Sequence, residues 1–130
     1  MIDYEVKIFN NAYEVGAPKC ATNRFVSTPI VSYSNLPACS LYEMDNQTVR
    51  NLQSSTPVDN FARITWQLDV AATTKAKCRE IFCVVDERMI SMNFSRISAH
   101  YVTYPDNPKV VRYVARYEAT VDRDGNLYRI

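Results

Sequence analysis

The sequence predicts an α+β domain in which two α-helices pack on one face of an antiparallel or mixed β-sheet. Two segments with helical apolar periodicity and two segments with strict two-residue alternation predict this class. One-sided alternation is typical of a sheet that has one face on the core and the other toward water. The chain has 130 residues, which fits one domain covering residues 1–130.

The first predicted helix covers residues 2–15. Asp3 and Glu5 lie in its first turn, where the helix dipole favours negative charge. Gly16 and Pro18 predict its end. Spacings of three and four residues predict one buried stripe, formed by Ile2, Val6, Phe9 and Tyr13.

Two strands and a long loop are expected next. Residues 24–34 are rich in β-branched side chains, but Pro29 interrupts them, so an irregular or edge strand is expected. A short strand should cover residues 38–44. Residues 45–60 are almost wholly polar and predict a long β–β loop. We expect this loop to order against a neighbouring subunit; a plain surface loop is the alternative.

The centre of the chain gives the clearest strand and helix. Residues 61–71 alternate between apolar and polar side chains, which predicts a strand with one buried face, formed by Ile64, Trp66, Leu68 and Val70. Thr73 or Thr74 is expected to cap the helix that follows. The buried face of that helix is predicted to consist of Cys78, Ile81, Phe82, Val85 and Met89.

The last third of the chain predicts two strands, a turn and a short return strand. The first strand is expected at residues 94–104. The second, at 110–121, should point its arginines outward and bury Val111, Tyr113, Ala115, Tyr117, Ala119 and Val121. Asp124 and Gly125 are typical of a hairpin turn, after which residues 127–130 would return along the sheet.

Composition excludes several functional classes. A net charge of +1 argues against a dedicated nucleic-acid-binding domain. The acidic start predicts no secretion signal, and no apolar run approaches the roughly 20 residues that span a bilayer. We therefore expect a cytosol-like compartment with four free thiols. With two glycines, the chain lacks a phosphate-binding loop or dinucleotide fingerprint.

The sequence predicts no catalytic or metal site. His100 is the only histidine and is interpreted as a structural or surface residue. Asp122 and Asp124 flank a turn glycine but lack the full calcium-loop pattern. No C-x-x-C motif occurs among the cysteines, which are Cys20, Cys39, Cys78 and Cys83. We therefore expect no enzymatic activity and no cofactor.

Alternating arginine and tyrosine residues raise the question of nucleic-acid binding. Arginine with aromatic side chains can contact phosphates and stack on bases. In the strand, however, Arg112 and Arg116 would lie on one face and Tyr113 and Tyr117 on the other. Contacts with protein are therefore favoured, since tyrosine and arginine are enriched at protein interfaces.

The chain resembles the small tail terminator and neck proteins of siphophages, especially those of Gram-positive hosts and their prophages. The resemblance covers most of the chain by element order. Its segments, after the leading helix, are LPACSLYEMDN, QLDVAATTKAKCREIFCVVDERM and RYVARYEATVDRDGNLYRI. The junction of strand, Leu-Asp-Val, Thr-Thr-Lys and helix at residues 64–90 is the most specific part.

The resemblance implies a virion structural protein, assembled in the host cytoplasm. It would form a homohexameric ring that caps the tail tube and joins it to the head-completion, or stopper, protein. DNA would pass through the lumen without sequence-specific binding, and no cofactor or membrane is implied. From this resemblance we expect subunit or tube contacts at Arg50, Leu52, Arg63, Arg112, Arg116, Leu127, Tyr128 and Ile130.

Three alternatives stay open. The first is another structural role in the same particle, as a head–tail connector, minor capsid or tail-tube subunit. The second is a small ligand-binding or enzymatic α+β domain with a tyrosine-lined pocket, expected to be a stable monomer or dimer. The third is a nucleic-acid-binding protein, whose affinity would depend strongly on salt.

Overall fold

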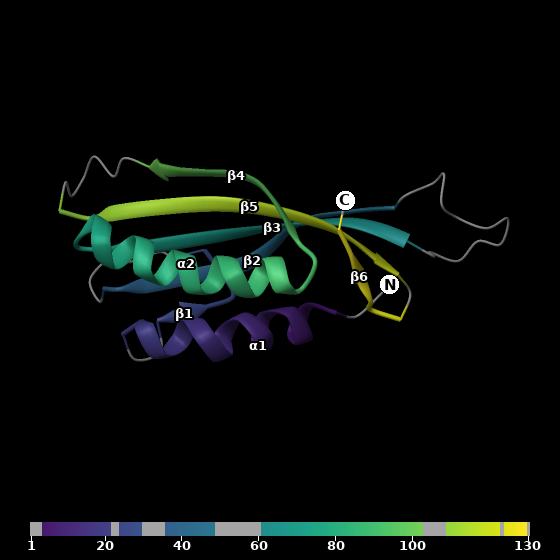
Figure 1. Ribbon diagram of the computed structural model, residues 1–130, viewed down its shortest axis with the longest axis horizontal. Helices are drawn as coiled ribbons and strands as arrows, with labels where there is room; N and C mark the ends of the chain where they lie inside the picture. The colour runs from purple at the N-terminus through teal and green to yellow at the C-terminus, as the bar shows by residue number, and fades with distance from the viewer. Residues whose placement is uncertain are drawn as a thin grey trace, which may run out of the picture.

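The computed structural model describes residues 4–21, 24–29, 36–48, 61–102, 109–122 and 124–129. Two helices lie on one face of a curled, mixed sheet (Figure 1), which confirms the predicted α+β class. The strand order is β1-β2-β3-β5-β4, and β6 pairs with β5. The elements are α1 (Glu5–Gly16), a 3-10 turn (Ala17–Lys19), β1 (Phe25–Val26), β2 (Ala38–Thr48), β3 (Phe61–Ala72), α2 (Lys75–Ser91), β4 (Ser95–Val102), β5 (Val111–Asp122) and β6 (Leu127–Tyr128).

The centre of the sheet is a long antiparallel array of β2, β3 and β5. Leu68 of β3 stands opposite Leu41 of β2 and Ala115 of β5. All three are fully buried beneath the helices. The predicted apolar face of β3 is confirmed, because Ile64, Trp66, Leu68 and Val70 are each at most 2% exposed.

The second strand is longer than its polarity predicted. β2 continues to Thr48, which pairs with Ala62, so the prediction of a loop beginning at residue 45 is wrong. Backbone pairing with β3 holds this polar stretch in the sheet, and a register shift between Glu43 and Asp45 re-aims its side chains. The remainder of the predicted loop, residues 49–60, lies outside the described residues.

The first helix packs on a different face from the predicted one. Its buried residues, with Tyr4 just before it, recur every four positions: Tyr4, Ile8, Ala12 and Gly16. Of the predicted stripe, Phe9 is partly buried against the core. Val6 is 66% and Tyr13 43% exposed, so their predicted burial is wrong, and Ile2 lies outside the described residues. The reason is steric: small residues let α1 approach so closely that a Cβ at Gly16 would overlap the Phe25 ring.

The second helix matches its prediction. Its buried residues are the five expected ones, Cys78, Ile81, Phe82, Val85 and Met89. Thr74 is the cap, and its hydroxyl accepts a hydrogen bond of 3.2 Å from the Lys77 amide. The helix is followed by Asn93 at φ 74°, a left-handed conformation that asparagine tolerates.

The C-terminal part also follows its predicted pattern. Ala115, Tyr117, Ala119 and Val121 are buried, whereas Val111 and Tyr113 are partly buried against the core. The predicted turn is confirmed: Gly125 has φ +84°, and the Asp122 carboxylate accepts two backbone N–H groups at 2.9 Å. The described part of the return strand is β6, Leu127–Tyr128.

The shorter edges of the sheet are only partly described. β1 covers Phe25–Val26 of the predicted irregular strand and runs parallel to β2. β4 covers Ser95–Val102. Residues 30–35 and 103–108 lie outside the description. Among the described residues, no helix is both long and apolar enough to cross a bilayer.

Candidate functional site

The predicted contact residues fall on two surfaces of the fold. Arg63 and Arg116 are exposed on the sheet face opposite the helices, and Tyr128 is exposed on β6. Leu127 is partly buried against the core. The other three, Arg50, Leu52 and Ile130, lie outside the described residues.

Arg112 is less accessible than expected. Its guanidinium forms an ion pair of 2.5 Å with Asp69, and the two side chains are 21% and 7% exposed. The Nε atom of Arg112 also lies 3.4 Å from the second carboxylate oxygen. This two-point contact ties β5 to β3 and leaves Arg112 little freedom to reach another molecule.

A hydrogen-bonded row crosses three strands on the same open face. Gln67 of β3 donates to the Tyr42 hydroxyl of β2 at 2.9 Å. Arg116 of β5 donates from Nε to the Gln67 carbonyl oxygen at 3.3 Å. These hydrogen bonds hold the three polar side chains in place, so this part of the open face is polar rather than apolar.

The outer edge of β4 is the longer of the two sheet edges. β4 pairs with β5 on one side only within the described chain. A register shift between Arg96 and Ser98 displaces Ile97, which is 49% exposed, and Tyr101 is 39% exposed. Unpaired backbone groups beside exposed apolar side chains favour association with another strand.

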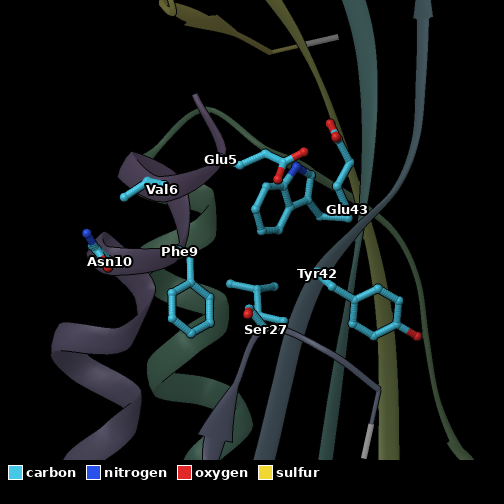
Figure 2. Close-up of a pocket in the computed structure, with 9 residues that line it drawn as sticks. Glu5, Val6, Phe9, Asn10, Ser27, Tyr42 and Glu43 are labelled. Carbon is cyan, nitrogen blue, oxygen red and sulfur yellow. The ribbon is translucent and has the colours of Figure 1, made fainter. Parts of the chain in front are cut away.

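A cavity of about 400 Å³ lies between the first half of α1 and the sheet (Figure 2). Its position follows from the packing of α1, because the helix contacts the core through Ile8 and Ala12 and leaves the neighbouring side open. Figure 2 shows Glu5 of α1 and Glu43 of β2 directed toward each other across the cavity. The lining residues are Glu5, Val6, Phe9, Asn10, Ser27, Leu41, Tyr42, Glu43 and Trp66.

The two glutamates make the cavity acidic. Burial is the main cause that raises the pKa of Glu43, to about 7; the hydrogen bond from Tyr4 opposes this rise, and the neighbouring Glu5 adds to it. The Tyr4 hydroxyl donates to the Glu43 carboxylate and accepts a hydrogen bond of 2.7 Å from the Asn46 amide. Burial, followed by the Glu43 contact, also raises the pKa of Tyr4. Glu43 can therefore take up or release a proton near neutral pH.

Trp66 forms the back of the cavity. It stands opposite Glu43 in the β2–β3 register and is 2% exposed. Its Nε1 is buried and has no hydrogen-bond partner among the described residues. A buried indole N–H is normally paired, so Trp66 contributes an unsatisfied donor to the lining of the cavity.

Sequence reasoning placed Trp66 in the core and did not single out Glu5 or Glu43. The strand that begins at residue 38 did contain a sequence pattern that could have identified Glu43. Leu41 and Glu43 are two residues apart, so they share a face, and an apolar partner predicts that this face is the inner one. A carboxylate on an inner face is the unusual feature that marks the cavity.

The remaining polar candidates do not assemble into a catalytic centre within the described chain. His100 is exposed on β4. Cys39 and Cys78 are buried and Cys83 is exposed. The thiol of Cys20 is hydrogen-bonded to that of Cys39, and this contact, with Lys77 nearby, lowers the pKa of Cys20. No group of three or more potential metal ligands occurs among the described residues.

Comparison of the chain with models of known protein families gives no match. Comparison with curated proteins gives no match either.

Proposed function

We propose that the protein is a structural subunit of a long-tailed bacteriophage, a tail terminator that closes the tail tube. Its subunits would form a hexameric ring that joins the tube to the head-completion protein. The resemblance of its sequence segments to tail terminator and neck proteins motivates the proposal. The observation that carries it is the outer edge of β4, which no other described strand pairs with, on a sheet whose described helices lie on one face.

The β4 edge suits a ring interface. β4 spans eight residues, and alternate residues turn their backbone N–H and C=O groups away from β5, on the strand that carries the exposed Ile97 and Tyr101. A strand edge of this length is a hazard in a free monomer, and a closed ring removes it by pairing every edge. No catalytic chemistry is needed for this role, which agrees with the expectation of no enzymatic activity.

The paired ends of β2 and β3 support the proposal from the opposite end of the sheet. They run past the ends of both helices (Figure 1). Met44, Asp45, Asn46 and Gln47 are exposed there, as is Arg63. An extension of this kind can reach a neighbouring subunit or the tube, and it leads into the segment that contains Arg50 and Leu52.

The open sheet face is compatible with DNA that passes through the ring without sequence-specific binding. Arg116 is exposed there, but Glu118 lies on the same strand and face, and the chain carries a net charge of only +1. Sequence-specific binding by a dedicated module requires a concentrated positive surface. Mixed charges of this kind suit a lumen that DNA traverses.

The first test is the mass of the purified protein by light scattering, alone and with the tail-tube protein of the same virus. A closed ring of about six subunits, or a ring that forms only on the tube end, supports a terminator. Unlimited stacking would instead favour the alternative of a tail-tube subunit. A stable monomer that ignores the tube would refute a ring-forming role.

Two variants locate the interface. Ile97→Lys places a charge on the β4 edge and should prevent ring formation without unfolding the domain. Ala76→Lys adds the same charge at an exposed site on α2 and should assemble normally. Equal assembly of both variants would show that β4 is not the interface.

A further inference from the structure

We propose that the cavity between α1 and β2 binds an organic cation, an alkylammonium or guanidinium group that carries a neighbouring oxygen acceptor. This site does not depend on ring formation. Binding of a small cationic probe needs no ring, so this test can succeed or fail independently of the role in assembly.

The charge of the cavity calls for a cation. Glu5 and Glu43 face each other from two different elements (Figure 2), and none of the described lining residues is basic. Two carboxylates this close cannot both be ionised without cost unless a proton or a cation lies between them. A bound cation would therefore relieve repulsion that the free protein relieves by protonation.

Trp66 specifies the second feature of the ligand. An indole N–H can only donate a hydrogen bond, and leaving such a donor buried without a partner is unfavourable. A carbonyl or hydroxyl oxygen on the ligand would accept this hydrogen. Trp66 and Phe9 also supply aromatic walls, which attract cations through the face of the ring.

The same features argue for an organic ion rather than a metal ion. The indole N–H cannot be a metal ligand, and aromatic walls do not coordinate a hard cation. The volume of about 400 Å³ lies within the range of small-molecule sites, about 300–1,000 Å³. An alkyl chain on the cation would bury its apolar surface against Val6 and Phe9.

Binding of the cation should compete with the proton on Glu43. The groups that face Glu43 are Tyr4 and Glu5 from the start of α1 and Asp45 from its own strand, while Trp66 of β3 carries no charge. The pKa of Glu43 is about 7 in the free protein, and a guanidinium stays charged over this range. Affinity should therefore rise as the pH is raised through neutrality.

The probe for the test is N-acetyl-arginine amide, which combines a guanidinium with carbonyl oxygens. Trp66 is the only tryptophan of the chain, so its fluorescence reports on the cavity directly. We expect a saturable change in emission, with affinity about tenfold higher at pH of about 8 than at about 6 for a group of pKa about 7. Butylguanidinium, which lacks the acceptor, should bind more weakly.

Matched variants assign the binding to the two carboxylates. Glu43→Gln and Glu5→Gln should each weaken binding by about tenfold or more, and Glu43→Gln should remove its pH dependence. Glu87→Gln removes the same charge from an exposed site on α2 and should bind like the unchanged protein. Circular dichroism confirms that each variant is folded.

Light scattering then identifies the source of the cation. If Glu43→Gln and Glu5→Gln lower the mass of the self-associated protein, the cation is a basic side chain of a second copy. If the mass is unchanged while probe binding is lost, the ligand is a free small molecule. Absence of a saturable change with the probe at millimolar concentration, or equal binding by Glu43→Gln and Glu87→Gln, would overturn the proposal.

Discussion

Replacement of Gly16 by alanine should destabilise the protein, although alanine is the better helix former. Gly16 is the last residue of α1, with φ −88° and ψ −40°, so the backbone accepts alanine. The added Cβ, however, would lie 2.8 Å from Cδ2 of Phe25 and 2.9 Å from Cγ2 of Val85. Both neighbours are core side chains, so neither can rotate into solvent.

The magnitude follows from two opposing effects. Overpacking of a core contact costs about 1–3 kcal/mol, while the change from glycine to alanine in a helix gains up to about 1 kcal/mol. Both contacts are under 3 Å and involve buried side chains, so we expect a cost near the top of this range. The free energy of unfolding should therefore fall by about 2 kcal/mol. Urea unfolding followed by Trp66 fluorescence measures this loss.

A double-mutant cycle separates steric overlap from other causes. Phe25→Leu removes the ring that the new methyl would meet, so Gly16→Ala should cost much less in that background. Gly125→Ala is the control, since a Cβ there meets nothing within 4 Å and its cost arises from φ +84° alone. A neutral or stabilising Gly16→Ala, or additive behaviour with Phe25→Leu, would refute the close-approach explanation of α1 packing.

Three further predictions concern polar contacts. Thr74→Ala should lower the free energy of unfolding by about 1 kcal/mol, because it removes the cap of α2; urea unfolding measures it. Arg112→Ala should lower it by about 3 kcal/mol, because Asp69 is left buried without this ion pair. The raised pKa of Glu43, about 7 in the folded state against 4.5 ordinarily, stabilises the fold below pH 4.5. That contribution should be lost as the pH rises through about 7, and Glu43→Gln should flatten this part of the stability–pH curve.

Each of these predictions has a result that would contradict it. Thr74→Ser retains the cap hydroxyl and should be nearly neutral, so an equal loss in both variants would exclude capping as the cause. Arg112→Ala combined with Asp69→Asn should recover part of the loss, and no recovery would mean that the ion pair is not responsible. An unchanged pH profile in Glu43→Gln would show that another group titrates.

The sequence predicted α2 well because that helix buries large side chains at regular spacing. The same method assigned α1 to the wrong face, since Ala12 and Gly16 carry little hydrophobic signal while their small size lets the helix approach the sheet. The polarity of residues 45–48 likewise led to the incorrect prediction of a loop. Backbone hydrogen bonds to β3 keep these residues in the strand despite their polar side chains.

The candidate site was harder to predict than the fold. Its two carboxylates come from α1 and β2. Glu5 approaches Glu43 only because α1 packs on a face that the sequence did not predict. The Trp66 indole has no hydrogen-bond partner among the described residues, and this depends on side-chain geometry that sequence spacing does not reveal. The contact surfaces proposed for assembly remain predictions, and three of their eight residues lie outside the described part of the chain.

The position of β3 between β2 and β5 has a consequence for biosynthesis. As the chain leaves the ribosome, β2 can pair with β3 at once, but the opposite edge of β3 stays open until α2, β4 and β5 have emerged. Arg63, Gln67 and Asp69 alternate along that strand, and such polar side chains discourage premature pairing between nascent chains. The polar face of β3 would thus protect the protein before it can form its own sheet.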